Sequence, residues 1–305
     1  MDRKMQSCLL LLTLTVALCA CNPAPTPTPT PAPTATPAAP ASTASAADTE
    51  AWLHADLAPG EAVVWYLGHC GYAIRTRNHL LIFDYQEERD GQARKRKPSA
   101  PGLENGWIVP QQIVDLPVRI FVTHSHSDHY SGAILDWQST ISDIAYYFGW
   151  EASGDPAYHY LVGPRAQLSA DGMEIYTINS HHSGVPEVAY LVRVDGLTIY
   201  HNGDYMGEFQ ADFPFLHDIT DHIDLTFTIR GYEDGSAYLG QNLDLFQRFR
   251  HGVVFPTHDT ARGSGYAKFE QVFLAQVPGL SIFSPRWMGE RFLYRNGQIS
   301  REEAS

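Results

Sequence analysis

Cysteine is scarce in this sequence, which has only four cysteines in 305 residues. Three of them lie among the first 21 residues, so Cys70 stands alone in the remainder of the chain. That remainder cannot form an intramolecular disulfide, and no cysteine has the C-x-x-C partner that zinc fingers require. Disulfide-stapled scaffolds and zinc-finger modules are therefore excluded.

Basic residues are also few, with 21 Lys and Arg against 34 Asp and Glu, and the net charge is −13. An acidic protein repels phosphate backbones, so we expect no nucleic-acid partner. The sequence also lacks the Gly-x-Ser-x-Gly motif of serine hydrolases, and no base is placed beside Cys70. The expected partner is a small-molecule substrate, and the sequence indicates no oligomeric state.

The apolar run Cys8–Ala20 is nearly continuous and follows two basic residues. It is too short for a transmembrane helix, which needs about 20 residues, so residues 1–20 are predicted to be an export signal. Its end, Leu18–Cys21, resembles a bacterial lipobox, which implies cleavage before Cys21 and lipidation of that cysteine. A plain secretory signal is the alternative. We expect an exported bacterial lipoprotein at the outer membrane or cell surface.

The next segment, Asn22–Ala47, consists almost entirely of Pro, Thr, Ala and Ser. Proline fixes φ and removes a backbone donor, so such a segment favours an extended polyproline conformation and builds no core. Residues 21–50 are therefore predicted to be a tether. Residues 51–305 are predicted to form one folded domain, which contacts the membrane only through the N-terminal lipid anchor.

A cluster of potential metal ligands follows the apolar, β-branched run Val118–Val122, which is typical of a buried strand. The ligand types are imidazole and carboxylate, which suit zinc and also manganese or iron. One tetrahedral ion cannot easily bind four side chains from so short a loop, so a second ion is expected. A histidine-rich surface loop is the alternative. The four side chains are His124, His126, Asp128 and His129.

This His-x-His-x-Asp-His motif resembles the signature of the metallo-β-lactamase superfamily, and the resemblance extends from about Ala62 onward. It implies an α/β fold, an αββα sandwich with a dinuclear metal site at one edge of its two sheets. The segment Gly68–Gly71, followed by Leu80–Asp84, is similar to the lactonase-like branch of the family. In that branch His69 lies near the metals without binding them; a core histidine is the alternative.

The resemblance also assigns ligands from later strand ends. A third histidine is expected after the strand Met173–Ile178, where His182 is favoured over its neighbour His181. Asp204, in a Gly-Asp pair, matches the carboxylate that bridges the ions, and a histidine after a late strand completes the second site. The implied assignment places His124, His126 and His182 on one ion and Asp128, His129 and His258 on the other, with Asp204 between them.

These ligands predict a metal-dependent hydrolase. A hydroxide shared by two cations, most simply Zn²⁺ with Mn²⁺ or Fe²⁺ as alternatives, would cleave an ester, lactone or phosphodiester bond. Asp128 is the predicted catalytic residue, accepting a proton or orienting the hydroxide. Alternatives are a mononuclear iron oxidoreductase similar to sulfur dioxygenases and a non-catalytic metal-binding lipoprotein. The histidine at position 126 argues against flavodiiron redox relatives, which carry a carboxylate there.

Overall fold

The computed structural model describes residues 46–87, 101–151, 157–233, 235–259 and 264–301. The predicted signal segment and Cys21 lie outside these residues, as does most of the predicted tether. The first described element, α1 (Ala46–Leu53), begins a few residues before the expected domain start at 51. Its Asp48 pairs with Arg291 at 2.7 Å, so α1 is attached to the folded domain.

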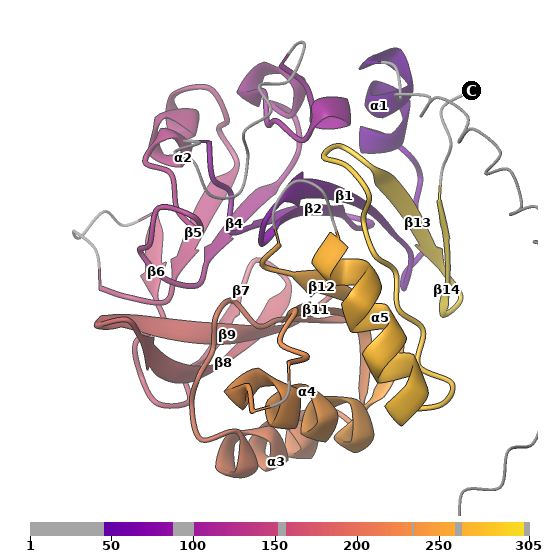
Figure 1. Cartoon of the computed structure of the whole chain (residues 1–305). Helices are drawn as coiled ribbons and strands as arrows, with labels where there is room; N and C mark the ends of the chain where they lie inside the picture. The colour runs from indigo at the N-terminus through magenta and orange to yellow at the C-terminus, as the bar shows by residue number, and fades with distance from the viewer. Residues whose placement is uncertain (1–45, 88–100, 152–156, 234, 260–263, 302–305) are drawn as a thin grey trace, which may run out of the picture. The chain divides into compact units, whose positions relative to one another are not determined.

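Two β-sheets form the framework of the domain, one of eight strands and one of six (Figure 1). The larger sheet has the order β14 (Gln298–Arg301), β13 (Arg291–Arg295), β1 (Ala62–Gly68), β2 (Gly71–Arg75), β3 (Leu80–Phe83), β4 (Val118–Val122), β5 (Ile144–Phe148) and β6 (Tyr158–Tyr160). The smaller sheet has the order β12 (Arg250–Thr257), β11 (His222–Ile229), β10 (Leu197–His201), β9 (Val185–Val194), β8 (Met173–His182) and β7 (Gln167–Ala170).

The main hydrophobic core lies between the two sheets. Alternate residues of a strand point to opposite faces, so each sheet directs one set of apolar side chains inward. Phe83 and Phe121 of the larger sheet stack with ring centroids 4.7 Å apart, and Tyr190 of the smaller sheet packs edge-on against Phe121 at 5.3 Å. All three side chains are buried, and a buried side chain of this size stabilises the fold by about 1.5–3 kcal/mol.

Helices cover the outer face of each sheet, which completes the predicted αββα sandwich (Figure 1). A second apolar cluster joins α1 and the α2 region to the larger sheet, and a third joins the remaining helices to the smaller sheet. The helical elements are the 3₁₀ turns Leu103–Asn105, Pro110–Gln112 and Trp137–Ser139, together with α2 (Ala133–Asp136), α3 (Phe209–Ile219), α4 (Ala237–Arg248) and α5 (Ser264–Gln276).

Strand directions bring several strand ends to one edge of each sheet. In the larger sheet β1, β3 and β4 run the same way, because β2 is antiparallel to both β1 and β3 while β3 and β4 are parallel. In the smaller sheet β8, β10, β11 and β12 share a direction by the same reasoning. The residues that follow these strands are therefore collected at common edges.

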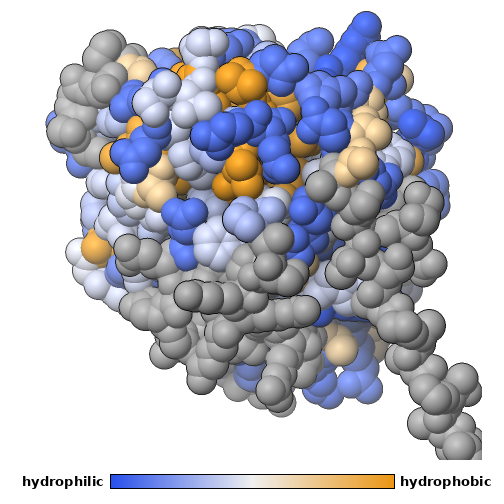
Figure 2. Space-filling model, turned by 90° about the horizontal axis from the view of Figure 1, so that it is seen from above, coloured by the Kyte–Doolittle hydropathy of each residue, from blue (hydrophilic) through white to orange (hydrophobic). Residues whose placement is uncertain are grey.

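Within the described residues, none of the helices combines the length and hydrophobicity needed to cross a membrane. Figure 2 shows the molecule from above: the coloured part of this face is largely hydrophilic, with apolar residues gathered among the hydrophilic ones in its upper part.

Candidate metal centre

The histidine loop begins directly after β4 and is fixed at its first residue. The carboxylate of Asp84 accepts hydrogen bonds from the backbone N–H of Thr123 at 2.8 Å and from its hydroxyl at 2.9 Å. The carbonyl of His126 then accepts from the N–H groups of His129 and Tyr130, at 3.0 and 2.9 Å, which closes a tight turn. This turn aims several side chains at one point.

One group of side chains consists of His124, His126 and His182. One nitrogen of each lies within 4.8 Å of the others. The ring of His182 lies 5.5 Å from that of His124 and 5.3 Å from that of His126, measured between centroids. His182 reaches the loop because β8 continues through it, pairing His182 with Val185 of β9.

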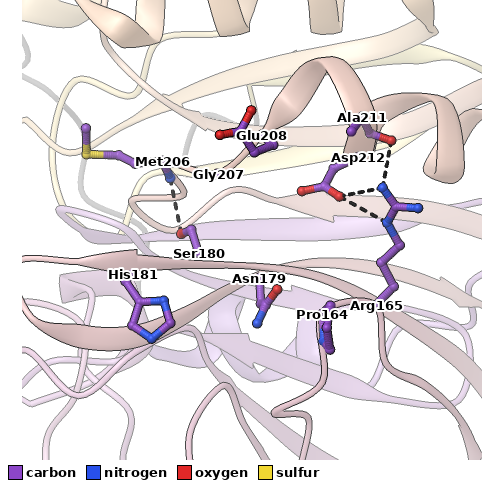
Figure 3. Close-up of a pocket in the computed structure, with 10 residues that line it drawn as sticks. All are labelled: Pro164, Arg165, Asn179, Ser180, His181, Met206, Gly207, Glu208, Ala211 and Asp212. Carbon is purple, nitrogen blue, oxygen red and sulfur yellow. Dashed lines mark hydrogen bonds and ion pairs between the residues drawn. The ribbon is translucent and has the colours of Figure 1, made fainter.

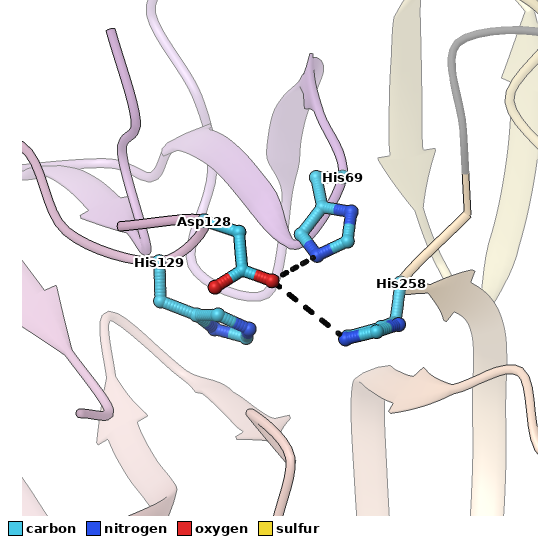
Figure 4. A group of neighbouring side chains, drawn as sticks. All are labelled: His69, Asp128, His129 and His258. Atoms are coloured by element: carbon cyan, nitrogen blue, oxygen red, sulfur yellow. Dashed lines mark ion pairs between the residues drawn. The ribbon is translucent and has the colours of Figure 1, made fainter. Parts of the chain in front are cut away.

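A second group consists of His69, Asp128, His129 and His258, whose potential ligand atoms also lie within 4.8 Å of one another. Figure 4 shows the Asp128 carboxylate directed toward both His69 and His258. Its Oδ2 lies 3.3 Å from Nε2 of His69 and 4.0 Å from Nε2 of His258. His69 comes from the β1–β2 turn and His258 follows β12, so this group joins the edges of both sheets.

Asp204 lies between the two groups. Its Oδ2 is 3.4 Å from Nε2 of His182 in the first group and 3.1 Å from Nε2 of His258 in the second. Its Oδ1 is 3.4 Å from Nε2 of His129. A carboxylate in this place can bind two neighbouring cations, one with each group.

Two buried carboxyl groups contact the Nδ1 atoms of His129 and His124. Oδ2 of Asp84 lies 2.7 Å from Nδ1 of His129. Oε1 of Glu187 lies 3.3 Å from Nδ1 of His124 and accepts a hydrogen bond of 2.5 Å from the backbone N–H of Asp204. Such contacts fix which ring nitrogen is free to bind a metal.

Several buried polar atoms of the site lack hydrogen-bond partners within the described part of the chain, as expected of atoms that bind a metal ion. Buried polar atoms normally have hydrogen-bond partners, and an unpartnered one is costly. Among the described residues, several buried atoms of this cluster have no hydrogen-bond partner, although Glu187 and Asp84 support the other ring nitrogen of His124 and of His129. They are Nε2 of His124, Nε2 of His129, Nδ1 of His182, Oδ1 of Asp204 and both ring nitrogens of His69. Cations would satisfy inward-facing nitrogen and carboxylate atoms of this kind.

The local electrostatics also suit cations. Burial and the nearby His129 lower the pKa of His124 to about 3, so its imidazole is neutral at physiological pH, the form that binds metal. Burial opposes ionisation of Asp204, but His129 and His258 outweigh it and hold its pKa well below the ordinary value. Burial and the charge of Asp204 raise the pKa of Glu187 to about 9, so that carboxyl is protonated at neutral pH.

The structure brings all of the sequence-predicted ligands to one place. They are His124, His126, Asp128, His129, His182, Asp204 and His258. Of the two adjacent histidines at the end of β8, His182 joins the cluster while His181 is exposed. His69, for which the sequence left a core role open, lies in the second group.

His181 instead lines a separate open cavity of about 860 Å³ (Figure 3). The guanidinium of Arg165 donates there to Oδ1 of Asp212, at 3.0 Å from Nε and 2.9 Å from its terminal nitrogen. The Tyr205 hydroxyl donates to the other oxygen of Asp212 at 2.5 Å. Arg165, Asp212 and Tyr205 thus satisfy one another at one side of this cavity.

Sequence reasoning missed the supporting roles of Asp84 and Glu187. The sequence did mark Asp84 as a candidate site residue, because it ends an apolar strand in a segment that resembles the family. Glu187 had none beyond being a charged residue within the apolar run of β9, where its side chain has no exposed surface. Its position next to His124 depends on an isolated β-bridge between residues 124 and 187, which no local pattern encodes.

Comparison with known proteins places the fold in a family. Residues 63–258, more than half of the chain, match the model of the Beta-lactamase superfamily domain. A UPF0173 metal-dependent hydrolase from Thermococcus kodakarensis is 30% identical over 155 residues, covering 46% of this chain and 60% of that protein. The match thus spans less than two thirds of the relative's length.

Solved structures agree on the fold. Igni18, a metallo hydrolase from Ignicoccus hospitalis, has a TM-score of 0.51 and 18% identity, covering 77% of this chain and 99% of that one. The metallo-beta-lactamase fold protein YhfI from Bacillus subtilis has a TM-score of 0.50 and 14% identity, covering 74% and 98%. On its sequence match and its fold, this chain belongs to the metallo-β-lactamase superfamily.

Proposed function

We propose that this protein is a metal-dependent hydrolase that uses two divalent cations to cleave an ester, lactone or phosphodiester bond. The observation that carries the proposal is the position of Asp204, within 3.4 Å of His182 on one side and 3.1 Å of His258 on the other. A carboxylate between two groups of unpartnered ligand atoms is suited to a pair of ions. The relative from Thermococcus kodakarensis, a metal-dependent hydrolase by name, supports the same reading.

The ligands divide between the ions as the two groups divide in space. His124, His126 and His182 would hold one ion, and Asp128, His129 and His258 would hold the other, with Asp204 shared. Nε2 of His69 lies 3.3 Å from Oδ2 of Asp128. In this position His69 can either donate a hydrogen bond to that carboxylate or bind the second ion itself. Neutral imidazoles with carboxylates suit Zn²⁺, and Mn²⁺ or Fe²⁺ would also fit this donor set.

When bound, such ions supply an activated water and polarise the oxygen of the bond to be cleaved. Among the protein groups, we assign Asp128 the role of orienting that water. Burial opposes ionisation of Asp128, but the nearby His69 and the charge of His129 outweigh it and lower its pKa strongly. A carboxylate this acidic is a weak base, so orientation is favoured over proton storage.

Metal content and turnover test the proposal together. The purified chain, loaded with Zn²⁺, should contain close to two ions and should hydrolyse at least one member of a panel of lactones, phosphodiesters and β-lactams. Asp128→Ala should remove most of that activity, whereas Asp136→Ala, an exposed carboxylate on nearby α2, should not. Full activity of the Asp128 variant would remove the assigned role, and iron with oxygen uptake would point to an oxidoreductase.

We also propose that the protein is an exported lipoprotein anchored through Cys21. The support is the basic start, the short apolar run and the lipobox-like end of residues 1–21, followed by the Pro- and Thr-rich tether. Expression in a bacterial host with labelled palmitate should label the wild-type chain. A Cys21→Ser variant should lose the label, and a secreted but unlabelled wild-type chain would favour the plain secretory signal.

A further inference from the structure

A small cavity of about 250 Å³ opens beside the metal centre, where β11 and β12 end and α4 begins. Three of the candidate ligands form its inner wall, so anything bound there lies next to the metals. The other residues of the wall come from the end of β11, from the β11–α4 connection and from α4 itself. The lining residues are His182, Asp204, Ile229, Arg230, Gly231, Glu233, Ser236, Tyr238 and His258.

Arg230 is the only guanidinium or ammonium group among these lining residues. Its Nε donates a hydrogen bond of 2.9 Å to the carbonyl of His258, which holds the guanidinium plane beside a candidate ligand. The side chain is 33% exposed, so its outer edge is accessible from the cavity. Its position is therefore fixed by the same backbone that places His258.

The acidic neighbours of Arg230 do not use up its hydrogen-bonding capacity. Oε1 of Glu233 lies 3.5 Å from one terminal nitrogen, and Oδ1 of Asp259 lies 3.6 Å from Nε. Both distances are longer than a good N–H···O hydrogen bond. Within the described part of the chain, the other terminal nitrogen of Arg230 has no polar partner. The Glu233 side chain is 57% exposed, so a bound anion can displace it at small cost.

Two further polar groups of the wall make hydrogen bonds within the protein. The hydroxyl of Tyr238 donates to the carbonyl of Asp204 at 3.1 Å, and the hydroxyl of Ser236 accepts from the N–H of Tyr238 at 3.3 Å. The net charge of −13 repels anions from the molecule as a whole. The positive charge of Arg230 can offset this repulsion, so Arg230 is the lining residue best suited to bind an anion.

We propose that Arg230 binds an oxyanion group of the substrate, a carboxylate or a phosphate, and so selects small anionic substrates. The proposal rests on the hydrolase function above, because it names the substrate class of the same site. Arginine presents paired donors that match the two oxygens of such a group. The anionic end contacts Arg230 while the bond to be cleaved lies over Asp204 and His258.

Binding of inert acids tests this without requiring turnover. Succinate and butyrate each offer one carboxylate to the metals, but only succinate has a second one for Arg230. Calorimetry on the Zn²⁺-loaded full chain should show that succinate binds more tightly by about tenfold or more, since hydrogen bonds between charged groups are strong. Replacing succinate with 3-phosphonopropionate shows which oxyanion is preferred.

Variants then assign the preference to Arg230. Arg230→Gln should reduce it to about twofold or less, Arg230→Lys should keep part of it, and Glu233→Gln should increase it by removing the competing charge. If the Arg230→Gln variant fails to fold, the preference for succinate in the Arg230→Lys and Glu233→Gln variants still tests the role of Arg230. A wild-type protein without the preference, or a Gln variant that retains it, overturns the proposal. A preference without hydrolysis of any ester would instead contradict only the hydrolase function.

Discussion

The carboxylate of Asp84 lies 2.7 Å from Nδ1 of His129, and neither side chain has exposed surface. The same carboxylate accepts hydrogen bonds from the N–H and hydroxyl of Thr123, at the start of the histidine loop. One side chain from the end of β3 therefore fixes both the first residue of the loop and its last histidine. It leaves Nε2 of His129 facing Asp204.

Asp84→Asn should weaken binding of the ion that we propose for the second group. The amide can keep one contact to Thr123, but it lacks the negative charge that holds the His129 ring with Nε2 free. Loss of such a supporting carboxylate typically lowers metal affinity by about 10–100-fold. Competition with a zinc chelator measures the zinc affinity of the variant. Asp136→Asn is the control, because the carboxylate of Asp136 is exposed. Equal affinity in the Asp84 variant and the wild type would show that Thr123 alone positions the loop.

Two replacements of Glu187 should show whether the hydrogen-bonding shape or the charge of its side chain stabilises the protein. Because its carboxyl is protonated at neutral pH, Glu187→Gln should behave nearly as the wild type. Glu187→Ala removes the acceptor for the Asp204 N–H, and an unsatisfied buried donor costs about 1–3 kcal/mol. Urea unfolding of the metal-free protein measures the free energy of unfolding of both variants. If Gln proves as damaging as Ala, the carboxyl is ionised in the folded state.

Gly203→Ala should destabilise the protein and disturb the loop. Gly203 has a φ of 55°, and a Cβ there would lie 2.7 Å from the hydroxyl oxygen of Thr123. Alanine at a positive φ already costs more than about 1 kcal/mol, and the steric clash adds to it. Gly297→Ala is the matched control, because Gly297 has a φ of 71° and an added methyl group there would meet nothing within 4 Å.

Thermal and urea unfolding of the two glycine variants measure the difference. Gly297→Ala reports the backbone strain alone, so the excess destabilisation of Gly203→Ala reports the contact with Thr123. Zinc affinity should fall only in the Gly203 variant, because Thr123 begins the histidine loop. Equal destabilisation of the two variants would mean that the loop moves aside without cost.

Local patterns in the sequence predicted most of the fold. Apolar runs marked the strands, and the hairpin between β9 and β10 turns at Asp195 and Gly196, whose φ values of 50° and 84° explain the Asp-Gly pair. The predicted ligands lie at strand ends because strands of one direction end at one edge. The segment Tyr160–Gly163 also predicts a strand, but the strand lies earlier in the chain: β6 covers Tyr158–Tyr160, because it pairs with β5 from Tyr146 to Phe148.

Features set by long-range pairing escaped sequence reasoning. The expected strand Met173–Ile178 continues to His182, because β9 pairs with it along the whole of that length. The family resemblance placed His69 near the metals, with a core histidine as the alternative. The turn between β1 and β2 holds His69 at a φ of 52°, a conformation uncommon for histidine, and it lies in the second group. Glu187 meets His124 across the two sheets. None of these contacts is local, so composition and periodicity cannot reveal them.

His251 lies near the start of β12, away from the metal centre. Its Nε2–H donates to the carbonyl of Leu245 at 3.1 Å, and Nδ1 lies 2.7 Å from the hydroxyl of Thr226. The neutral ring satisfies both contacts. Burial lowers the pKa of His251 from 6.5 to about 4, so the folded protein resists protonation that the unfolded chain accepts.

This difference in pKa makes the stability of the protein depend on pH. Between about pH 4 and pH 6.5 the unfolded chain binds the proton and the folded protein does not, so stability falls as the pH falls, by up to about 1.4 kcal/mol per pH unit. Above that range the contribution is fully present. His251→Gln removes the titrating group, so its stability should fall less steeply on acidification than that of the wild type. Urea unfolding of both metal-free proteins across this range measures the slopes, and parallel slopes would show that the His251 ring is hydrated in the folded state.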